Sequence, residues 1–372
     1  MTDLKEEVRR FSASIGLELF GVTTAEPFDS FLDALEARGE DYQGRYAYRM
    51  ESWKKLATPR DVMPDARAVI VIGFSYLPEE QKPEGAHGQM GRIVAYGHLG
   101  ILKRARQVRS FLESKGYKAV AGLHRKEAAV RAGLGFLGKN NLVINPDYGS
   151  WVAYQSIVTD APLAPDAPFE EDLCGSCDKC LKACPTGALY EPRRLNPDLC
   201  VACLLTTRDV PENLLSAMNA NILGCDICQE VCPRNLKLRP KPDMESLLPA
   251  QLGMYPPLDL MLQMDEQTFQ KEVIGFIQNK IARRSLLNSL MKITVLRRLL
   301  MRLMQIFARG KEMLPETFVH ASGNLETYKR NALVAVGNSR ATDLKPLVQS
   351  FEQDDYLGDY ARWALRRLEN ES

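Results

Sequence analysis

The stretch from Cys174 to Pro185 reads CGSCDKCLKACP, which has the spacing C-x2-C-x2-C-x3-C-P. Further along the chain, residues 225–233 read CDICQEVCP and repeat the last part of that pattern. Proteins with two [4Fe–4S] clusters use such runs: the first three cysteines bind one cluster, and the fourth crosses to the other. This rule predicts one site formed by Cys174, Cys177, Cys180 and Cys232. The second site would contain Cys184, Cys225 and Cys228.

The second site needs one more thiolate, and only Cys200 and Cys203 remain of the nine cysteines. Two four-cysteine zinc sites are the alternative, because zinc also uses C-x2-C hooks, but it requires neither the x3-C-P ending nor a crossing ligand. Disulfides are favoured still less. Thiolates at this density survive as cluster ligands in a reducing compartment, so we expect a cytoplasmic protein.

Composition limits the remaining classes. A length of 372 residues allows two or three domains, and a formal charge of +1 gives no overall bias toward nucleic acid. No run of eighteen apolar residues exists, so no transmembrane segment is predicted. Arg9 and Arg10 are not an export signal, because Glu18 interrupts the apolar segment that follows. Instead, a helical apolar stripe runs through Leu4, Val8, Phe11 and Ile15.

An α/β domain is predicted for residues 1–165. Residues 68–74 (AVIVIGF) are an uninterrupted apolar run, typical of a strand buried on both faces. Residues 101–114 have the pattern of a helix with a basic outer face, and residues 151–158 alternate like a strand. The two patterns together favour a mixed domain.

Two further domains are expected after it. The proline-rich residues 161–169 indicate a linker. A thiol-rich domain would then occupy residues 166–240, and a helical domain residues 241–372. In the latter, residues 330–338 and 360–368 form two short amphipathic patterns of the kind that helical repeats use.

Gly133, Gly135 and Gly138 form a literal G-x-G-x-x-G. That motif indicates a dinucleotide site only between a strand and the helix that follows it. Here the order is reversed, because residues 127–132 are helix-like and residues 141–145 are strand-like. Two interpretations remain: a tight glycine turn, or a glycine-lined surface that a large flat cofactor can approach closely.

Four segments together resemble the epoxyqueuosine reductase family. They are residues 131–140 (RAGLGFLGKN), 146–151 (PDYGSW), 174–188 (CGSCDKCLKACPTGA) and 224–235 (GCDICQEVCPRN). The resemblance implies an α/β nitroreductase-like corrinoid-binding domain, a ferredoxin-like two-cluster domain and an α-helical HEAT-like C-terminal domain. The implied cofactors are cobalamin and two [4Fe–4S] clusters, and the implied reaction is the reduction of epoxyqueuosine to queuosine in tRNA.

The resemblance also implies specific ligands. Cys200 stands at the family's position for the eighth cluster ligand, which would leave Cys203 as a spare thiol. The corrinoid would lie against the glycine motif and the two residues after it. The expected cofactor-binding residues are therefore Gly133, Gly135, Gly138, Lys139 and Asn140.

The chain departs from the family where a proton donor is expected. Ala119 stands in the register of the family's aspartate, and Gly97-His-Leu-Gly replaces its G-x-D-Y-H segment. We therefore predict His124 as the general acid, because histidine titrates near neutrality, with Tyr96 as the second candidate. The alternative is that His124 is a surface histidine beside Arg125 and Lys126.

Residues 273–311 contain nine Lys or Arg and no Asp or Glu. The phosphates of tRNA would explain such a stretch; a membrane-surface helix and a solvated face are the alternatives. We also expect a low-potential electron donor, flavodoxin-like or ferredoxin-like. Besides a reductase acting on tRNA or on another substrate, two classes stay open: an electron-transfer or corrinoid-reactivating protein, and an iron–sulfur module that binds nucleic acid.

Overall fold

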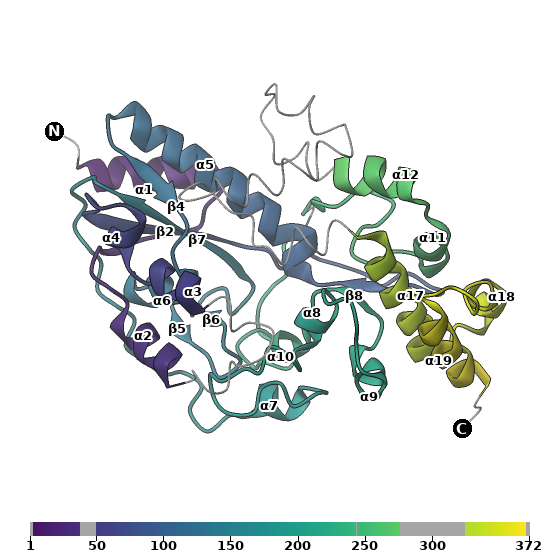
Figure 1. The fold of residues 1–372 in the computed structure, drawn as a ribbon. Coiled ribbons are helices and arrows are strands. Elements are labelled where there is room, and N and C mark those ends of the chain that lie inside the picture. Colours follow the sequence, from purple (N-terminus) through teal and green to yellow (C-terminus); the bar gives the residue numbers. More distant parts are fainter. Residues whose placement is uncertain (1–2, 38–49, 243, 276–323, 370–372) are drawn as a thin grey trace.

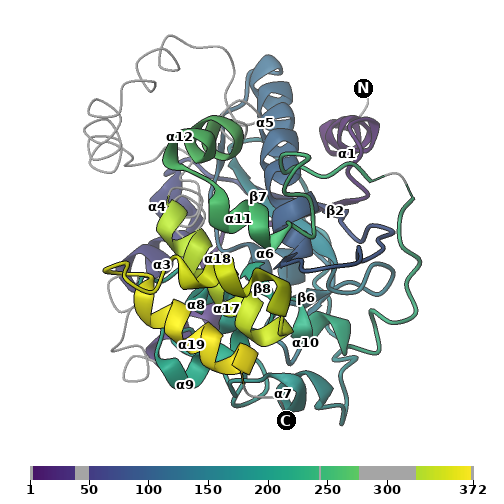
Figure 2. The same cartoon turned by 90° about the vertical axis from the view of Figure 1, so that its right-hand side faces the viewer.

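The computed structural model describes residues 3–37, 50–242, 244–275 and 324–369, and Figures 1 and 2 show them from two directions. Apart from residues 273–275, the basic stretch lies outside the described residues. Among the described helices, none combines enough length and apolarity to cross a bilayer.

A four-stranded antiparallel sheet forms the centre of the N-terminal part, with the strand order β1-β2-β7-β4. Its strands are β1 (Leu19–Thr24), β2 (Ala68–Ser75), β4 (Ala119–Ala121) and β7 (Val152–Thr159). The strands predicted at residues 68–74 and 151–158 are confirmed as β2 and β7, which pair along their whole length. Every residue of β2 is buried, because the strand has a neighbour on each side and helices on each face.

Alternate residues of β2 serve two separate cores. Ile70 and Ile72 point to the side of α1 and α5, whereas Val69 and Val71 pack toward α6. Figure 1 shows this three-layer arrangement, with α1 and α5 on one face of the sheet and α2 and α6 on the other. The N-terminal helices are α1 (Leu4–Ser14), α2 (Asp29–Glu36), α3 (Met50–Leu56), α4 (Pro59–Val62), α5 (His98–Ser114) and α6 (Arg125–Arg131).

The two predicted helices on the first face are confirmed. In α1, Val8 is fully buried and the Asp3 carboxylate caps the amide of Lys5 at 3.1 Å. Phe11 stacks on Phe111 of α5 with 4.4 Å between ring centroids. A π-helical turn, Ile93–Gly97, leads directly into α5.

Two small sheets connect distant parts of the chain. β5 (Phe136–Leu137) and β6 (Val143–Ile144) form a hairpin after α6. β3 (Gln89–Met90) pairs in parallel with β8 (Asn221–Leu223). The second pair joins the N-terminal part to the thiol-rich segment.

The thiol-rich segment is built from short elements. They are α7 (Lys179–Ala183), α8 (Val201–Leu204), α9 (Glu212–Leu215), a 3-10 turn (Ser216–Met218) and α10 (Ile227–Glu230). Helices this short are marginal by themselves, so their geometry depends on tertiary partners and bound groups.

Residues 258–275 and 325–369 are largely helical, as predicted, whereas residues 244–257 form loops and turns, so the helical pattern expected from residue 244 begins only at Leu258. The elements are α11 (Leu258–Gln263), α12 (Glu266–Thr268), a π-helical segment (Phe269–Ile274), α17 (Leu325–Ser339), a 3-10 turn (Thr342–Leu344), α18 (Lys345–Gln349) and α19 (Gly358–Glu369). Figure 2 shows α17 and α19 side by side, and the two helices approach closely at Gly337, since an added Cβ there would lie 2.8 Å from Trp363. The helices are confirmed; their HEAT-like character stays a prediction.

The proline-rich residues 161–169 are not a free linker. Asp166 accepts hydrogen bonds from Lys5 Nζ at 2.7 Å and from the Val22 amide at 2.8 Å. The Phe169 amide donates to the carbonyl of Val130 at 3.0 Å. The segment contains no helix or strand, but it is held against the α/β unit, because Asp166 accepts hydrogen bonds from a side chain and a backbone amide of that unit.

Candidate functional site

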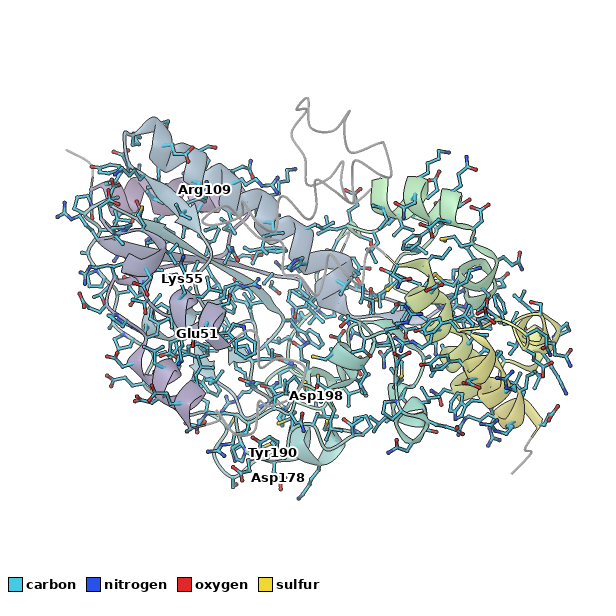
Figure 3. All side chains as sticks on the ribbon, in the orientation of Figure 1. Glu51, Lys55, Arg109, Asp178, Tyr190 and Asp198 are labelled. Atoms are coloured by element: carbon cyan, nitrogen blue, oxygen red, sulfur yellow. The ribbon has the colours of Figure 1, made fainter. Side chains whose placement is uncertain are left out.

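The first cysteine run folds into tight turns around a short helix. The Cys177 amide donates to the Cys174 carbonyl at 3.0 Å, and Gly175 between them has φ +52°. Cys180 lies in α7, and Cys184 caps its C-terminal end. In Figure 3, Asp178 of this run and Tyr190 and Asp198, which follow it, lie in the lower part of the molecule.

The second run approaches the first in a crossed manner. Helix α10, which carries Cys228, packs against α7. Burial raises the pKa of Cys180, and the thiols of Cys174 and Cys232 raise it further. Burial likewise raises the pKa of Cys225 to about 11, with a contribution from Cys184. The structure thus brings Cys232 to the first three cysteines and Cys184 to the second run.

Cys200 and Cys203 lie at opposite ends of one turn. Cys200 is the N-cap of α8, and the Cys203 amide donates to its carbonyl at 2.8 Å. A hydrogen bond between the two thiols, followed by burial, raises the pKa of Cys200. None of the nine cysteines forms a disulfide. In the described chain, no three His, Cys, Asp or Glu side chains converge as the shell of a single metal ion.

A buried ionic group links the second cysteine run to the α/β unit. Asp226, between Cys225 and Cys228, is 2% exposed and accepts from the amide and Nη1 of Arg92 at 2.8 and 3.3 Å. Arg92 also bonds Glu230 at 2.8 Å. Burial raises the pKa of Asp226 to about 6, although Arg92 opposes this shift.

A second, uncharged network crosses the same interface. Asn235, just after Cys232, donates to Ser150 Oγ and to the carbonyl of Gln229, each at 2.8 Å. Its amide oxygen accepts from the Ser150 amide at 2.9 Å. The Gln229 side chain accepts from Ser150 Oγ at 3.0 Å and from Tyr76 at 3.4 Å. Fully bonded buried networks of this kind fix the relative position of the parts they join.

Tyr96, the second proton-donor candidate, lies in the π-helical turn beside Glu80. Burial raises the pKa of Tyr96, and the Glu80 carboxylate raises it further. Burial also raises the pKa of Glu80, whose side chain is 9% exposed. Arg92 Nε lies 3.5 Å from Glu80 Oε2, so this pair adjoins the ionic group described above.

His124 is not the exposed surface histidine of the alternative reading. Its ring stacks on Phe31 with 3.7 Å between centroids, and its Nδ1 is buried without a hydrogen-bond partner among the described residues. Burial, then Lys126 and Arg125, lower its pKa to about 3. His98 is similar, since burial and Arg125 lower its pKa to about 4. His124 is therefore a neutral imidazole near pH 7, which makes it a poor general acid.

The glycine motif forms a turn, and the Rossmann interpretation stays excluded because α6 precedes it. Gly133, with φ +74°, ends α6 in a Schellman motif: its amide donates to Val130 and that of Leu134 to Ala129. A Cβ on Gly133 would lie 2.5 Å from the Ala167 carbonyl oxygen.

The other two glycines also face the protein itself. Gly135 has φ +145°, and a Cβ there would lie 2.4 Å from the Ile144 carbonyl oxygen. A Cβ on Gly138 would lie 2.4 Å from Ile144 Cδ1. We expected the missing side chains to leave room for a flat cofactor, and that physical reason is wrong. Residue 144 of the opposite hairpin strand and residue 167 of the 161–169 segment already occupy the space.

Lys139 and Asn140 occupy the tip of the hairpin. Lys139 Nζ donates to the Gly175 carbonyl at 2.6 Å, so Lys139 contacts the first cysteine run. Asn140 is 5% exposed; its oxygen accepts from Leu142, but its Nδ2 has no hydrogen-bond partner among the described residues.

An open depression of about 480 Å³ lies elsewhere, at α3, and includes none of the predicted site residues. It is lined by Leu32, Glu51, Lys54, Lys55, Thr58 and Asp61, of which Glu51 and Lys55 are labelled in Figure 3.

Sequence reasoning missed Arg92, Asp226 and Glu80. Asp226 sits inside a C-x2-C hook, where a carboxylate beside thiolates is unfavourable unless a cation joins it. That conflict was a signal that a basic residue elsewhere must approach the hook. Nothing in the spacing identifies Arg92 as that residue, because the pairing spans 134 positions.

Comparison with known proteins agrees with this organisation. Residues 173–235 match the family model of the 4Fe-4S double cluster binding domain, which spans both cysteine runs together with Cys200 and Cys203. The thiol-rich segment is thus a two-cluster domain.

Comparisons over longer parts of the chain extend the likeness. The chain is 34% identical to an epoxyqueuosine reductase of Bacillus subtilis over 62% of its own length and 64% of that protein's, so the match spans just under two thirds of that relative. It is 33% identical to one from Synechocystis sp., over 61% of this chain and 87% of the relative. A crystal structure of epoxyqueuosine reductase with an epoxyqueuosine-modified tRNA-Tyr stem loop superposes with a TM-score of 0.77 at 26% identity, covering 99% of this chain and 90% of that one. With its sequence, its two-cluster domain and its fold all matching, the chain belongs to the epoxyqueuosine reductase family.

Proposed function

We propose that this protein is an iron–sulfur and cobalamin-dependent oxidoreductase that reduces epoxyqueuosine to queuosine in tRNA. The observation that carries the proposal is the crossed approach of the two cysteine runs, joined to the α/β unit through Asp226 and Arg92. Clusters held in this way lie next to a second unit that can bind the acceptor of their electrons. Membership in the family supports the choice of substrate.

The proposed cluster ligands are eight of the nine cysteines. The first cluster takes Cys174, Cys177, Cys180 and Cys232, and the second takes Cys184, Cys200, Cys225 and Cys228. The thiols of the first site influence one another's pKa, as do those of Cys184, Cys225 and Cys228. Cys200 remains the predicted eighth ligand, with Cys203 as its competitor.

The proposed corrinoid site lies around α6 and its hairpin. Buried polar atoms without partners in the described chain, His124 Nδ1 and Asn140 Nδ2, suit a ligand rich in amide groups, as a corrin is. Cobalamin, when bound, supplies a low-potential reductant for the substrate. Lys139 would orient the hairpin tip toward the first cluster through its bond to Gly175. In this proposal the backbone of Gly133, Gly135 and Gly138 shapes the hairpin and does not itself receive the ring.

Reduction of the epoxide to an alkene consumes two electrons and two protons and releases water. The clusters would deliver the electrons singly. For the protons we favour Tyr96 over His124, because burial leaves His124 a neutral imidazole near pH 7, whereas Tyr96 has a carboxyl neighbour, Glu80, that can share its proton. The raised pKa of Tyr96 makes it a weak acid, so it depends on that neighbour. Glu80, with its raised pKa, lies where it can return a proton to Tyr96. Ala119 is buried in β4 and offers no acid.

The proposed macromolecular partner is tRNA, which the crystallised relative binds as a stem loop. The basic residues 273–311 are the proposed phosphate contact. A flavodoxin-like or ferredoxin-like protein would supply electrons, and both partners fit a reducing cytoplasm.

The test is an anaerobic assay of full-length protein. Purified protein should hold about eight irons on its thiolates, and cobalamin titration should change the corrin absorption spectrum. With a chemical reductant, a tRNA stem loop carrying epoxyqueuosine should lose one oxygen, as mass spectrometry would show. Cys200→Ser should lose or perturb one cluster, while Cys203→Ser should keep both.

Two variants separate the proton donors. Tyr96→Phe should reduce turnover strongly with cobalamin binding unchanged, whereas His124→Asn should retain most of the turnover. Iron and cobalamin bound without conversion of the stem loop would move the protein to a corrinoid reductase with another substrate. Iron bound without any change in the corrin spectrum would make it an electron-transfer or nucleic-acid-binding protein.

A further inference from the structure

A fully buried arginine lies under the two-cluster domain. Arg330 of α17 is 0% exposed. Its guanidinium donates to the carbonyl oxygens of Leu204, Leu205, Thr207 and Arg208 at 3.3, 3.4, 3.1 and 3.4 Å. These carbonyls lie at and just beyond the C-terminal end of α8, whose N-cap is Cys200.

Helix α8 needs such a partner. It has four residues, too few to hold itself in water, and its last carbonyls lack partners within the helix. A cation at the C-terminal end of a helix both bonds these carbonyls and matches the helix dipole. The placement of Cys200 and Cys203 at this turn therefore depends on Arg330.

The neighbouring residue, Asn331, connects the Cys200 segment to the segment that leads to Cys225. Asn331 Nδ2 donates to Leu205 at 2.9 Å and to Ile222 at 2.8 Å. Leu205 follows α8, while Ile222 lies in β8, three positions before Cys225. One amide thus joins the two chain segments that lead to Cys200 and Cys225.

The charge of Arg330 calls for an explanation beyond packing. These carbonyls accept hydrogen bonds from it, the Tyr360 hydroxyl adds a further side-chain interaction, and its Nε has no partner among the described residues. The guanidinium carbon lies 5.8 Å from the centroid of the Tyr360 ring, and Tyr356, Tyr360 and Asp209 act on the Arg330 charge without a described ion pair. A buried cation is costly unless an anion lies near it. A [4Fe–4S] cluster with four thiolates is an anion, and more negative when reduced.

We propose that Arg330 and Asn331 are positioning residues for the second cluster, the one with Cys184, Cys200, Cys225 and Cys228, and that the Arg330 charge raises its reduction potential. The inference rests on the cluster assignment in the proposed function. It gives the C-terminal helices a role in cluster chemistry, in addition to any contact with tRNA. Figures 1 and 2 both show α17 beside β8, on the side of the two-cluster domain.

The test uses full-length protein prepared anaerobically, with iron and sulfide analysis and potentiometric EPR of both clusters. Arg330→Met should lower the potential of one cluster and leave the other unchanged. Arg330→Lys keeps the charge and should hold that potential nearer to the wild-type value. The affected signal should be the one that Cys200→Ser abolishes.

Asn331 has a matched control on the same helix. Asn338 Nδ2 also donates to two carbonyls, those of Leu215 and Asn219, both at 2.9 Å, but on the intervening turn. Asn331→Ala should therefore lose iron of the second cluster to a chelator several times faster than wild type, while Asn338→Ala should match wild type. Circular dichroism would verify that each variant is folded.

Three results would overturn the inference. They are unchanged potentials in a folded Arg330→Met variant, equal shifts of both clusters, and equal iron loss from the Asn331 and Asn338 variants. Wild-type protein that binds no iron would instead refute the proposed function itself, so the two failures are distinguishable.

Discussion

At the scale of single residues, burial sets the protonation of the candidate acids and bases. His124 is stacked on Phe31 and has basic neighbours, so its pKa falls to about 3 from the ordinary 6.5. The pKa of His98 falls to about 4, also mainly because the ring is buried. Between these values and pH 6.5 the unfolded chain binds protons that the folded chain excludes, so stability rises with pH in that interval. The contribution is complete above about pH 6.5 and is lost as the pH falls.

We therefore predict that neither histidine titrates near neutrality. In carbon-13 NMR of protein labelled at the histidine Cε1 atoms, the signals of His98 and His124 should not shift between pH 8 and pH 5.5. The chain has four histidines, and His98→Asn and His124→Asn would assign the two signals. A His124 signal that titrates near pH 6.5 would show that its ring is solvated, and would return it to the list of general acids.

The second prediction distinguishes backbone strain from a clash at the glycines. Gly122 and Gly135 have similar φ values, +134° and +145°, but only Gly135 has a carbonyl oxygen where a Cβ would lie, since nothing lies within 4 Å at Gly122. Gly122→Ala should cost about 1–3 kcal/mol of stability through strain alone. Gly135→Ala should cost clearly more, because the β5–β6 hairpin must shift.

Thermal unfolding of the two variants measures this difference. If Gly135→Ala unfolds like Gly122→Ala and loses only cobalamin binding, the glycine faces the ligand as the sequence first suggested.

At the scale of elements, strand β7 fixes the loop that leads to His124. Ser156, fully buried in β7, accepts from the Leu123 amide and donates to the Leu123 carbonyl, both at 3.1 Å. The pairing of β4 with β7 ends at Ala121, and the Ser156 hydroxyl takes the place of the next backbone hydrogen bonds. It therefore holds the residue just before His124.

Ser156→Ala should lower the free energy of unfolding by about 1–3 kcal/mol, because the buried amide and carbonyl of Leu123 both lose their hydrogen-bond partner. Ser114→Ala is the matched control: that hydroxyl bonds the Phe111 carbonyl at 2.7 Å on an exposed helix end. Its effect should be within about 0.5 kcal/mol of zero. Urea unfolding would compare the two variants, and equal midpoints would contradict the role assigned to Ser156.

The elements that the sequence predicts well are those with a strong local pattern. β2 is recognisable because residues 68–74 are continuously apolar, and α5 because its apolar stripe is long. β4 has three residues and becomes a strand only by pairing with β7, whose residues lie 36 to 40 positions further along the chain. The same limit applies to the glycine motif, since its local pattern gives a turn but does not reveal that Ile144 and Ala167 fill the space beside it.

At the scale of the whole molecule, the cysteine spacing indicates which segments of the two-cluster domain meet, because the crossing rule pairs distant positions. It does not indicate how that domain joins the α/β unit. The joining contacts use Arg92, Ser150 and Asn235, and no spacing in the sequence indicates that these residues pair across the two units. Their partners become evident only when the chain is folded.

The last prediction tests that interface. Arg92→Met would leave Asp226, 2% exposed, as a buried carboxylate without its cation, at a cost of about 3–5 kcal/mol. Because Asp226 lies between Cys225 and Cys228, the loss should also loosen the second cysteine run, and iron should be released faster during thermal unfolding. The control is Arg60→Met, which removes an exposed pair with Glu26 at 3.0 Å and should cost at most about 1 kcal/mol. Calorimetry with iron analysis across the transition would compare the variants. If both variants unfold at the wild-type temperature, then Arg92 does not hold the α/β unit to the two-cluster domain, and the uncharged bonds of Asn235 and Ser150 carry that contact instead.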